Sequence, residues 1–589
     1  MTLLHPPTIH EAALARKALT KSLDSLDSEI DCLRDRLSTL SLEQRELHAS
    51  LGSYRGLLSP IRRLHPEILQ EIFFHCLPTA HSAVVSADEA PLVLGRVCSR
   101  WRRVAHSTPE LWASIHIAVI IPPHQSSPEV RQAIALRHAV AVWLSRSGTL
   151  PLSISLVDPD FYPHRSQSPT TIMNDQIRSY LDLIAPYAHR WRSIHFTAFR
   201  FHLMEFLNRF HTSEVPLLES LHIDGYSYDT QENIIPAISR PTNILQAPQL
   251  RVLSMPSYPP HILKSGAPLQ NLTGLIITDF CSSPSQETIN ILGLCPNLRR
   301  CAISACSGLW WGNSYDPLPV GPVTTMIMPK LQSLAILTMV PQYVKKLLKI
   351  LVTPSLRHLL ISLVVRDASK SKHLYDTLSS FLRHLIDPLE ELDLTYDLSG
   401  NPTDILSLVP ELKRLSLTAR PIVSVLGQLS SRTHDPVLVQ LTPSNGWRGT
   451  PGSQAGDEPD APTCLCPKLE VLRYVTAKFS DNELLDFLHS RTVDHRKHNA
   501  SHIRMVSVHF DREAQDDIEE MDLDLRKGIE VLERETGVRV DCAYNLLKPC
   551  QEPIFDGPTT MGYSPFDGVP PMVASNTDLV IETDDYFGF

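Results

Sequence analysis

The side chains with the clearest potential for chemistry are cysteines and histidines that lie near one another in the chain. Cys464 and Cys466 are one residue apart, but no second pair follows at the spacing of a zinc site. Cys295, Cys301 and Cys306 form a looser group. Packing inside the fold is favoured over a metal role for this group, because free cysteine behaves as a small apolar residue.

A short basic stretch contains three histidines, His495, His498 and His502, beside Arg496 and Lys497. This composition is compatible with metal binding, with a nuclear-import signal or with a solvated loop. The solvated loop is favoured because runs of charge normally face water. We therefore predict no metal site in this chain.

Motifs of the common enzyme classes are absent from the sequence. There is no Gly-x-x-x-x-Gly-Lys-(Ser/Thr) loop and no Gly-x-Gly-x-x-Gly turn to cradle a phosphate. There is also no Gly-x-Ser-x-Gly elbow and no His-Glu-x-x-His helix to carry a nucleophile or a metal. We predict that the protein is not an enzyme, has no catalytic residues and binds no cofactor.

The composition is that of an ordinary folded protein. Of the 589 residues, 43% are hydrophobic and 20% are charged, which excludes a wholly disordered chain. The net charge of −10 argues against a dedicated nucleic-acid binder, since such proteins carry a concentrated basic surface. The 47 prolines indicate many turns at fixed places.

Targeting signals are also missing. The first residues lack a basic segment followed by an apolar core, and no apolar run approaches the roughly 20 residues that span a bilayer. The 11 cysteines are an odd number, and reduced thiols are the default where no secretory signal is found. We expect an intracellular protein, cytoplasmic or nuclear or both, without a membrane partner.

Residues 11–58 have the pattern of a long helix with a coiled-coil seam. One series of apolar residues recurs every seven positions at Leu19, Leu26, Leu33, Leu40, Leu47 and Tyr54. A second series, offset by three or four positions and interrupted by Gln44, contains Leu23, Ile30, Leu37, Leu51 and Leu58. The seam could join two chains in a homodimer, or it could pack against another part of the same chain. Periodicity identifies the apolar face but not its partner.

The next segment predicts a small helical unit. Pro66 can start a helix because the first helical N–H has no partner in any case. After a polar loop, Leu94, Val97, Trp101 and Val104 share one face of a second predicted helix. Pro109 begins a short third turn.

This unit resembles the F-box. The motif residues are Leu64-x-Pro66-Glu67-Ile68-Leu69-x-x-Ile72-Phe73 and then Val97-Cys98-x-x-Trp101-Arg102-x-x-Ala105, and the following Leu111-Trp112 matches the form common in mushroom-type fungi. The resemblance covers only Leu64 to Ala105. The sequence departs from the family in having His65 where Pro is usual and in a longer loop between the helices, which could alter the adaptor-facing surface.

The resemblance implies a docking function. In that family the apolar helical face binds a Skp-type adaptor, which links to a cullin and a RING protein, and the rest of the chain holds a protein substrate for ubiquitin transfer. A unit of about 40 residues is near the lower limit for folding alone, and its apolar surface would be a liability unless a partner covered it. The residues carried over as adaptor-binding are Leu64, Pro66, Ile68, Leu69, Ile72, Phe73, Leu92, Val97 and Trp101. Some of these must instead form the core of the unit, and the sequence does not say which.

The remainder of the chain is a degenerate repeat of Pro-x-Leu-x-x-Leu-x-(Ile/Leu). Clear copies begin at Pro248, Pro296, Pro329, Pro354, Pro410 and Pro467. Looser copies centre on Trp191, Leu218, Leu272 and Leu389. The spacing is close to the roughly 20–29 residues of leucine-rich repeats, in which a short strand and a returning segment alternate. An ordinary α/β domain with amphipathic segments is the alternative.

Details of the repeat predict an irregular array. The inward Asn or Cys that closes each turn in leucine-rich repeats is mostly missing, since Met339, Val364 and Arg420 stand in its place. We therefore expect no amide ladder and a less uniformly curved solenoid. A return helix is predicted around Leu374 to Leu385, and an acidic helix between Asp511 and Glu535 is expected to cap the array.

The predicted fold class is thus α/β: a coiled-coil helix (1–58), an F-box (59–115), an irregular leucine-rich-repeat-like solenoid (116–550) with a mobile insertion at 444–462, and a partly disordered tail (551–589). The expected function is substrate recognition in a Skp–cullin–F-box ubiquitin ligase. The alternative is a non-catalytic scaffold built from the coiled coil and the repeats.

Overall fold

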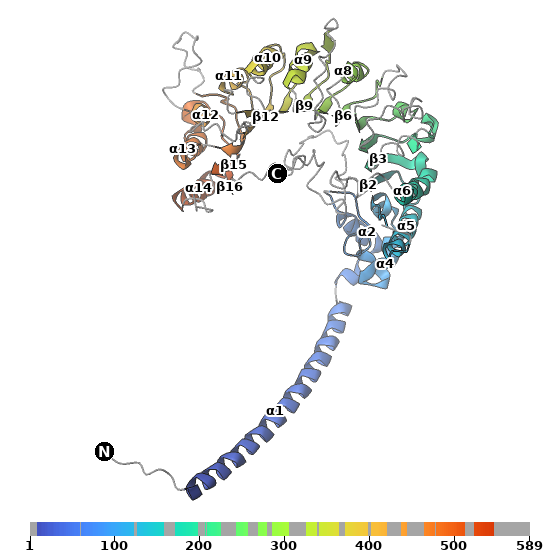
Figure 1. The fold of residues 1–589 in the computed structure, drawn as a ribbon, viewed down its shortest axis with the longest axis vertical. Coiled ribbons are helices and arrows are strands. Elements are labelled where there is room, and N and C mark those ends of the chain that lie inside the picture. Colours follow the sequence, from blue (N-terminus) through green and yellow to red (C-terminus); the bar gives the residue numbers. More distant parts are fainter. Residues whose placement is uncertain are drawn as a thin grey trace, which may run out of the picture.

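The fold is given by a computed structural model in which a long helix, a module of short helices and a large α/β array follow one another (Figure 1). Among the described residues, no helix is both long and apolar enough to cross a bilayer. The predicted insertion at 444–462 and the predicted tail at 551–589 lie outside the described residues. Those residues are 9–58, 60–79, 81–122, 126–157, 171–197, 206–207, 209–224, 243–256, 269–279, 286–305, 325–338, 341–363, 372–397, 402–420, 437–443, 464–477, 479–512 and 523–546.

The first two parts are helical. Helix α1 (Ile9–Leu58) extends away from the rest of the molecule (Figure 1). The helical module follows and ends where the sheet begins. Its elements are η1 (Pro60–Arg63), α2 (Pro66–His75), α3 (Leu94–Val97), α4 (Ser99–His106) and η2 (Pro109–Trp112). The predicted helix start at Pro66 and the predicted turn at Pro109 are both confirmed.

The array is built on one 14-stranded parallel sheet whose strand order follows the sequence. This order is that of a solenoid, in which each strand pairs with its predecessor. The strands of this sheet are β1 (Ser114–Ala118), β2 (Leu152–Val157), β3 (Trp191–Thr197), β4 (Ser220–Asp224), β5 (Val252–Pro256), β6 (Gly274–Asp279), β7 (Arg300–Ala305), β9 (Ser333–Thr338), β11 (His358–Leu363), β12 (Glu391–Asp397), β13 (Arg414–Arg420), β14 (Val471–Ala477), β15 (Met505–Arg512) and β16 (Arg539–Leu546). The short strands β8 (Met326–Ile327) and β10 (Leu351–Val352) pair separately.

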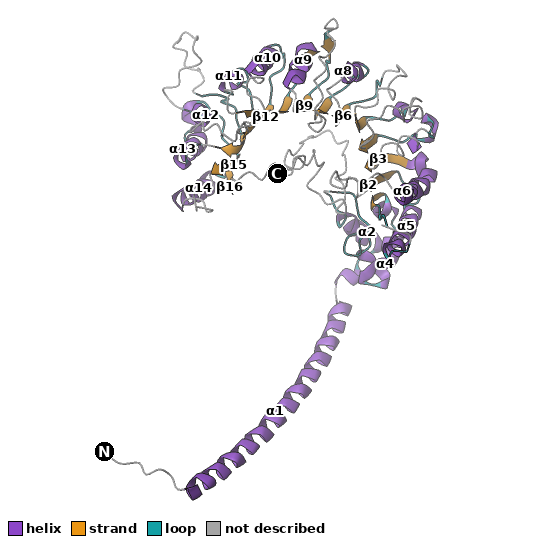
Figure 2. Ribbon diagram, in the orientation of Figure 1, coloured by secondary structure: helices purple, strands orange, loops and turns teal. Residues whose placement is uncertain are grey.

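Helices and turns cover the outer side of the arc, and the strands line its inner side (Figure 2). The predicted return helix is α10, and the predicted acidic helix corresponds to α14. The outer helices are α5 (Glu129–Arg146), α6 (Thr171–Ile184), α8 (Gln286–Gly293), α9 (Pro341–Ile350), α10 (Lys372–Arg383), α11 (Thr403–Leu406), α12 (Val437–Leu441), α13 (Asp481–Thr492) and α14 (Leu523–Thr536), with the 3-10 turns η4 (Ala185–Arg190), η5 (Thr212–Glu214), η7 (Asn243–Gln246) and η10 (His495–His498).

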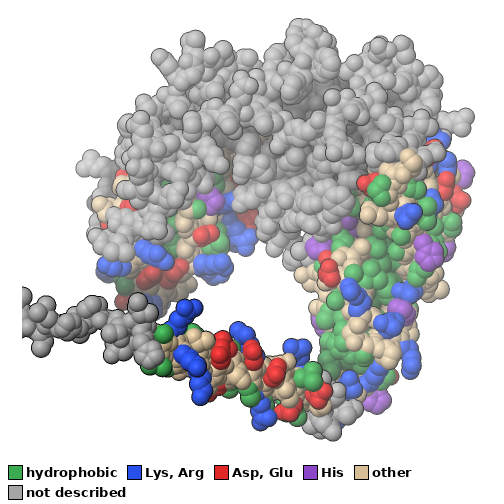
Figure 3. All heavy atoms as spheres, turned by 60° about the horizontal axis from the view of Figure 1, so that its bottom comes forward, with side chains coloured by type: hydrophobic (Ala, Val, Ile, Leu, Met, Phe, Trp, Pro, Cys, Tyr) green, Lys and Arg blue, Asp and Glu red, His purple; other side chains and the backbone are tan. Residues whose placement is uncertain are grey.

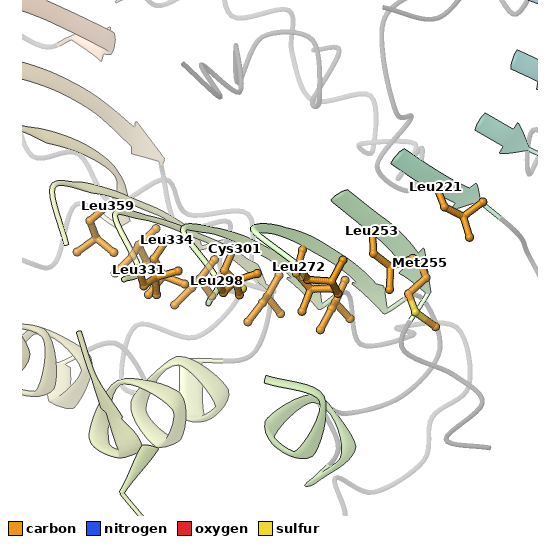
Figure 4. Close-up of a cluster of buried hydrophobic side chains, with 14 of the residues drawn as sticks. Leu221, Leu253, Met255, Leu272, Leu298, Cys301, Leu331, Leu334 and Leu359 are labelled. Carbon is orange, nitrogen blue, oxygen red and sulfur yellow. The ribbon is translucent and has the colours of Figure 1, made fainter. Parts of the chain in front are cut away.

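The leucines of the repeat form the core. Alternate strand residues such as Leu253 and Met255 are at most 2% exposed and point from the sheet toward the outer layer, as does Leu334 of β9 (Figure 4). The first leucine of each unit, for example Leu331, is also buried. These side chains belong to one continuous hydrophobic cluster that runs from the helical module to the last strand.

Main-chain hydrogen bonds tie successive repeats together just before each strand. The N–H of Arg299 donates to the carbonyl of Thr273 at 2.8 Å, and the N–H of Gln332 donates to Arg299 at 2.8 Å. The same bond recurs between Arg357 and Gln332 at 2.9 Å. Because these hydrogen bonds join only backbone groups, they link the repeats without an inward Asn side chain. The irregularity that we predicted lies in the outer layer, where long helices alternate with single turns, while the strands follow one arc.

The structure corrects three sequence predictions about the array. The boundary predicted between residues 115 and 116 falls inside β1, and the repeats begin at β1 and β2, which the proline–leucine pattern did not mark. Helix α14 does not end the array, because β16 follows it and pairs with β15. Strands β2 and β16 lack the preceding Pro-x-Leu, and in β1 the strand residues Ile115 and Ile117 come one place later after Pro109-Glu-Leu111 than the repeat pattern requires, although all three strands keep the alternating apolar residues.

Candidate functional site

Helix α2 of the module has one buried side and two exposed apolar residues. Leu69 and Phe73 are completely buried, and the Phe73 ring lies 4.9 Å from the ring of Trp101. In contrast, Ile68 is 51% exposed and Phe74 is 50% exposed. Neighbours along a helix point about 100° apart, so the packing that buries Leu69 and Phe73 turns Ile68 and Phe74 toward solvent.

We predicted that Leu94, Val97, Trp101 and Val104 lie on one helix, and this prediction is wrong. Cys98 is extended and divides the segment into α3 and α4, and its sulfur accepts a hydrogen bond from the Trp101 N–H at 3.4 Å. The break frees the carbonyl of Gly95, which accepts instead from Nε of Arg102 at 2.7 Å. Because the helix is interrupted, Val97 turns outward and is 59% exposed, while Leu94 and Val104 remain buried.

The structure sorts the predicted adaptor-binding residues by exposure. Two of them form the module's own core, namely Leu69 and Phe73. Four are half-buried, namely Leu64, Ile72, Leu92 and Trp101. Three are exposed, namely Pro66, Ile68 and Val97. The motif did not point to Phe74, although two consecutive Phe residues on a helix cannot both face its core.

The surface around the helical module is both hydrophobic and basic. Figure 3 shows hydrophobic side chains gathered on the part of the molecule that follows α1, with Arg and His side chains between them. Arg100 holds the chain before α2 in place, because its guanidinium donates to the carbonyls of Arg62 and Leu64. The segment before α2 is therefore held against α4.

Trp112 joins the module to the array. It is 1% exposed, and its Nε1 donates to the carbonyl of Ala105 in α4 at 2.8 Å. On its other side the ring packs edge-on against Trp143 of α5, with 5.0 Å between centroids. The guanidinium of Arg146 lies 4.6 Å from the same ring. The module and the first repeat therefore share one core.

The second candidate surface is the inner face of the sheet. One residue from each strand forms a row across it, because all the strands pair in parallel. The row begins with His116, Ser155, His195, His222 and Ser254. It continues with Ile276, Ala302, Ala335 and Leu360. It ends with Asp393, Ser416, Arg473, Ser507 and Asp541. The face thus changes from imidazole and hydroxyl groups to apolar groups and then to charged groups.

The histidines at the start of this row are close together. The rings of His195 and His222 are 3.9 Å apart, and Nδ1 of His116 lies 3.0 Å from Oγ of Ser155. Withdrawal of His195 from water lowers the pKa of its imidazole well below the ordinary value, and His222 and His116 add to this effect. His195 therefore stays neutral in the folded protein at mildly acidic pH.

This pKa shift predicts an acid-sensitive stability. The unfolded chain takes up a proton on His195 near pH 6.5 and the folded chain does not, so the free energy of unfolding falls below that pH, by at most about 1.4 kcal/mol per pH unit. We expect His195→Gln to reduce the loss of melting temperature between pH 7.5 and pH 5.5. An equal loss in the variant and the parent protein would contradict this assignment.

The cysteines considered at the outset lie inside the fold. Cys295 and Cys301 are buried in the core, as predicted, and Cys306 lies outside the described residues. Burial raises the pKa of Cys295 and of Cys466 to about 12, so both thiols remain protonated at neutral pH. In the described part of the chain, no group of three or more His, Cys, Asp or Glu side chains is placed to hold a metal ion.

Comparison with known proteins does not assign the chain to a family, since no family model matches the sequence and no significant match to a curated protein was found.

Proposed function

We propose that the protein is the substrate-recognition subunit of a Skp–cullin–F-box ubiquitin ligase. The helical module would dock to the Skp-type adaptor, and the array would hold the target protein. The observation that carries the proposal is the exposure of Ile68 and Val97, two apolar residues of the F-box-like motif, on a module whose core is already complete without them. Exposed apolar groups on a small helical module are typical of a surface that a partner covers.

The array supports the second half of the proposal. The row on its inner face is mostly buried from His116 to Ala335, whereas its last part carries half-buried or exposed charged groups at Asp393, Arg473 and Asp541. This last part suits recognition of a protein surface. In this proposal the chain performs no chemistry of its own, and ubiquitin transfer is left to the proteins that the adaptor recruits.

The adaptor face is tested by substituting exposed residues only. We expect Ile68→Asp combined with Val97→Asp to weaken capture of a Skp-type adaptor by at least ~100-fold, since each buried aliphatic side chain contributes about 1.5–3 kcal/mol. The measurement is adaptor affinity of the full chain by calorimetry. Leu69→Asp is unsuitable because a buried charge would unfold the module.

The matched control is Ile386→Asp combined with Val439→Asp, which makes the same two changes at positions 80% and 51% exposed elsewhere on the chain. This control is expected to bind the adaptor like the parent protein. Unchanged binding by the Ile68/Val97 variant, with an unchanged melting temperature, would reject the assigned face. Absence of adaptor binding by the parent protein would reject the proposed function.

A non-catalytic scaffold is the second candidate function, and the exposed length of α1 favours it. Quantitative proteomics after deletion of the gene separates the two functions. A ligase receptor predicts a small set of proteins that accumulate and that bind the array. A scaffold predicts altered assembly without accumulation.

A further inference from the structure

Helix α1 presents its apolar residues to solvent. The leucines and the isoleucine of the two heptad series that the structure describes are between 44% (Ile30 and Leu51) and 70% (Leu47) exposed. Tyr54 and Leu58 lie outside the residues whose side chains are described. The helix extends away from the module and the array (Figure 1), so packing back on the chain, which the sequence left open, does not occur in this structure.

The exposed residues form one narrow seam. The heptad d position is leucine throughout its described length, at Leu19, Leu26, Leu33, Leu40 and Leu47. The a position is occupied by Leu23, Ile30, Leu37, Gln44 and Leu51. Leu14 and Leu42 fall outside the seam, at the outward-facing f position. A strict seven-residue spacing over several turns requires a second helix that winds around the first.

Gln44 selects the arrangement of that second helix. In a parallel, in-register pair, the a positions face each other, so Gln44 meets its own copy and the two amides can hydrogen-bond. In an antiparallel pair, a faces d, and every described d residue is leucine. There the buried amide would lose its water without gaining a partner, which costs about 1–3 kcal/mol.

The flanking charges agree with the parallel arrangement. Glu29 occupies a g position, and Arg34 occupies the e position of the next heptad. In a parallel pair, g of one helix lies beside the following e of the other, so Glu29 faces the Arg34 of the second copy, twice per pair. Within one chain Arg34 already contacts Asp31 at 3.3 Å, and both side chains are exposed and free to rearrange.

We propose that two copies of this chain associate through a parallel, in-register, two-stranded coiled coil formed by α1 from Leu19 to Leu51. Because α1 is followed directly by the helical module, the pair would bring two modules to the same end of the coil. The proposal does not depend on what the modules bind.

Disruption of the seam is the first test. We expect the parent protein to have twice the 66.0 kDa mass of one chain in size-exclusion chromatography with light scattering, and Leu26→Asp combined with Leu33→Asp to have the mass of one chain. The matched control is Leu14→Asp combined with Leu42→Asp, which places the same charges on the outward face and should leave the pair intact. The melting temperature of the array should be unchanged in both variants, since α1 lies apart from it.

Orientation is the second test. On mild oxidation, Leu47→Cys at a d position is expected to form a disulfide-linked pair in high yield, whereas Ser38→Cys on the outer side should not exceed the parent protein. A parent protein of single-chain mass at micromolar concentration would overturn the proposal, and so would a mass of three or four chains. A protein of two-chain mass in which the Leu47→Cys variant fails to cross-link would overturn the parallel arrangement.

Discussion

Replacement of Arg491 by methionine is expected to lower the free energy of unfolding of the C-terminal repeats by about 3–5 kcal/mol. Arg491 is 0% exposed on α13, and its guanidinium donates to four main-chain carbonyls. It reaches Leu441 at 2.8 Å, Leu465 at 3.0 Å, and both Cys466 and Pro467 at 3.1 Å. Methionine would fill similar space but would remove the guanidinium donors to Leu441 and Leu465, while the carbonyls of Cys466 and Pro467 would keep the N–H groups of Leu469 and Ser501.

The position of Arg491 explains why its replacement should destabilise several repeats. Its partners lie at the end of α12 and just before β14, which are the chain segments on either side of residues 444–463. One guanidinium therefore holds both ends of that long connection against α13. Burial lowers the pKa of Arg491, but an arginine remains charged at neutral pH and keeps all its donors.

The measurement is thermal unfolding together with amide hydrogen exchange of residues 437–443 and 464–467, which should lose protection first. Arg491→Lys should recover only part of the stability, because an ammonium cannot reproduce the planar fork. Arg504→Met is the control, since Arg504 is exposed and pairs with Glu470 at 3.4 Å, and its loss should change stability by less than about 1 kcal/mol. If both Met variants melted alike, the tethering role of Arg491 would be wrong.

Replacement of Trp112 by alanine is expected to cost about 3–5 kcal/mol and to uncouple the helical module from the array. The substitution removes the contact with Trp143, the stacking of Arg146 and the hydrogen bond to Ala105. Hydrogen exchange should accelerate throughout α2 to α4 while the distant strands β11 to β14 keep their protection.

Trp112→Phe separates packing from hydrogen bonding. It retains an aromatic ring against Trp143 and loses the indole N–H together with part of the ring volume, so a smaller loss of about 1–2 kcal/mol than in the Ala variant is expected. Equal losses in the Ala and Phe variants would show that the hydrogen bond, and not the shared core, joins the two parts. In the proposed receptor, this shared core would fix the orientation of the array relative to the adaptor.

Much of the array could be predicted from the sequence alone. The Pro-x-Leu-x-x-Leu-x-Ile unit predicted which residues of β7, β9 and β11 face the core, because alternation along a strand is a local property. The start of α2 at Pro66 followed from local chemistry as well. The long helix at 11–58 was evident from its period, because the seam repeats over many turns.

Only the tertiary structure decided which apolar side chains of the module are available to a partner. Leu69 and Ile68 are adjacent and both fit the motif, yet one is buried and the other exposed, because exposure depends on how α2 packs against α4 and η2. The outward turn of Val97 depends on the break at Cys98, which Arg102 stabilises from the following turn. Arg491 looks like a surface residue in the sequence and becomes an internal tether because two separate segments, at Leu441 and at Leu465 to Pro467, converge on it. Periodic, local patterns are encoded residue by residue, whereas burial of a single side chain is set by contacts between segments that are distant in the chain.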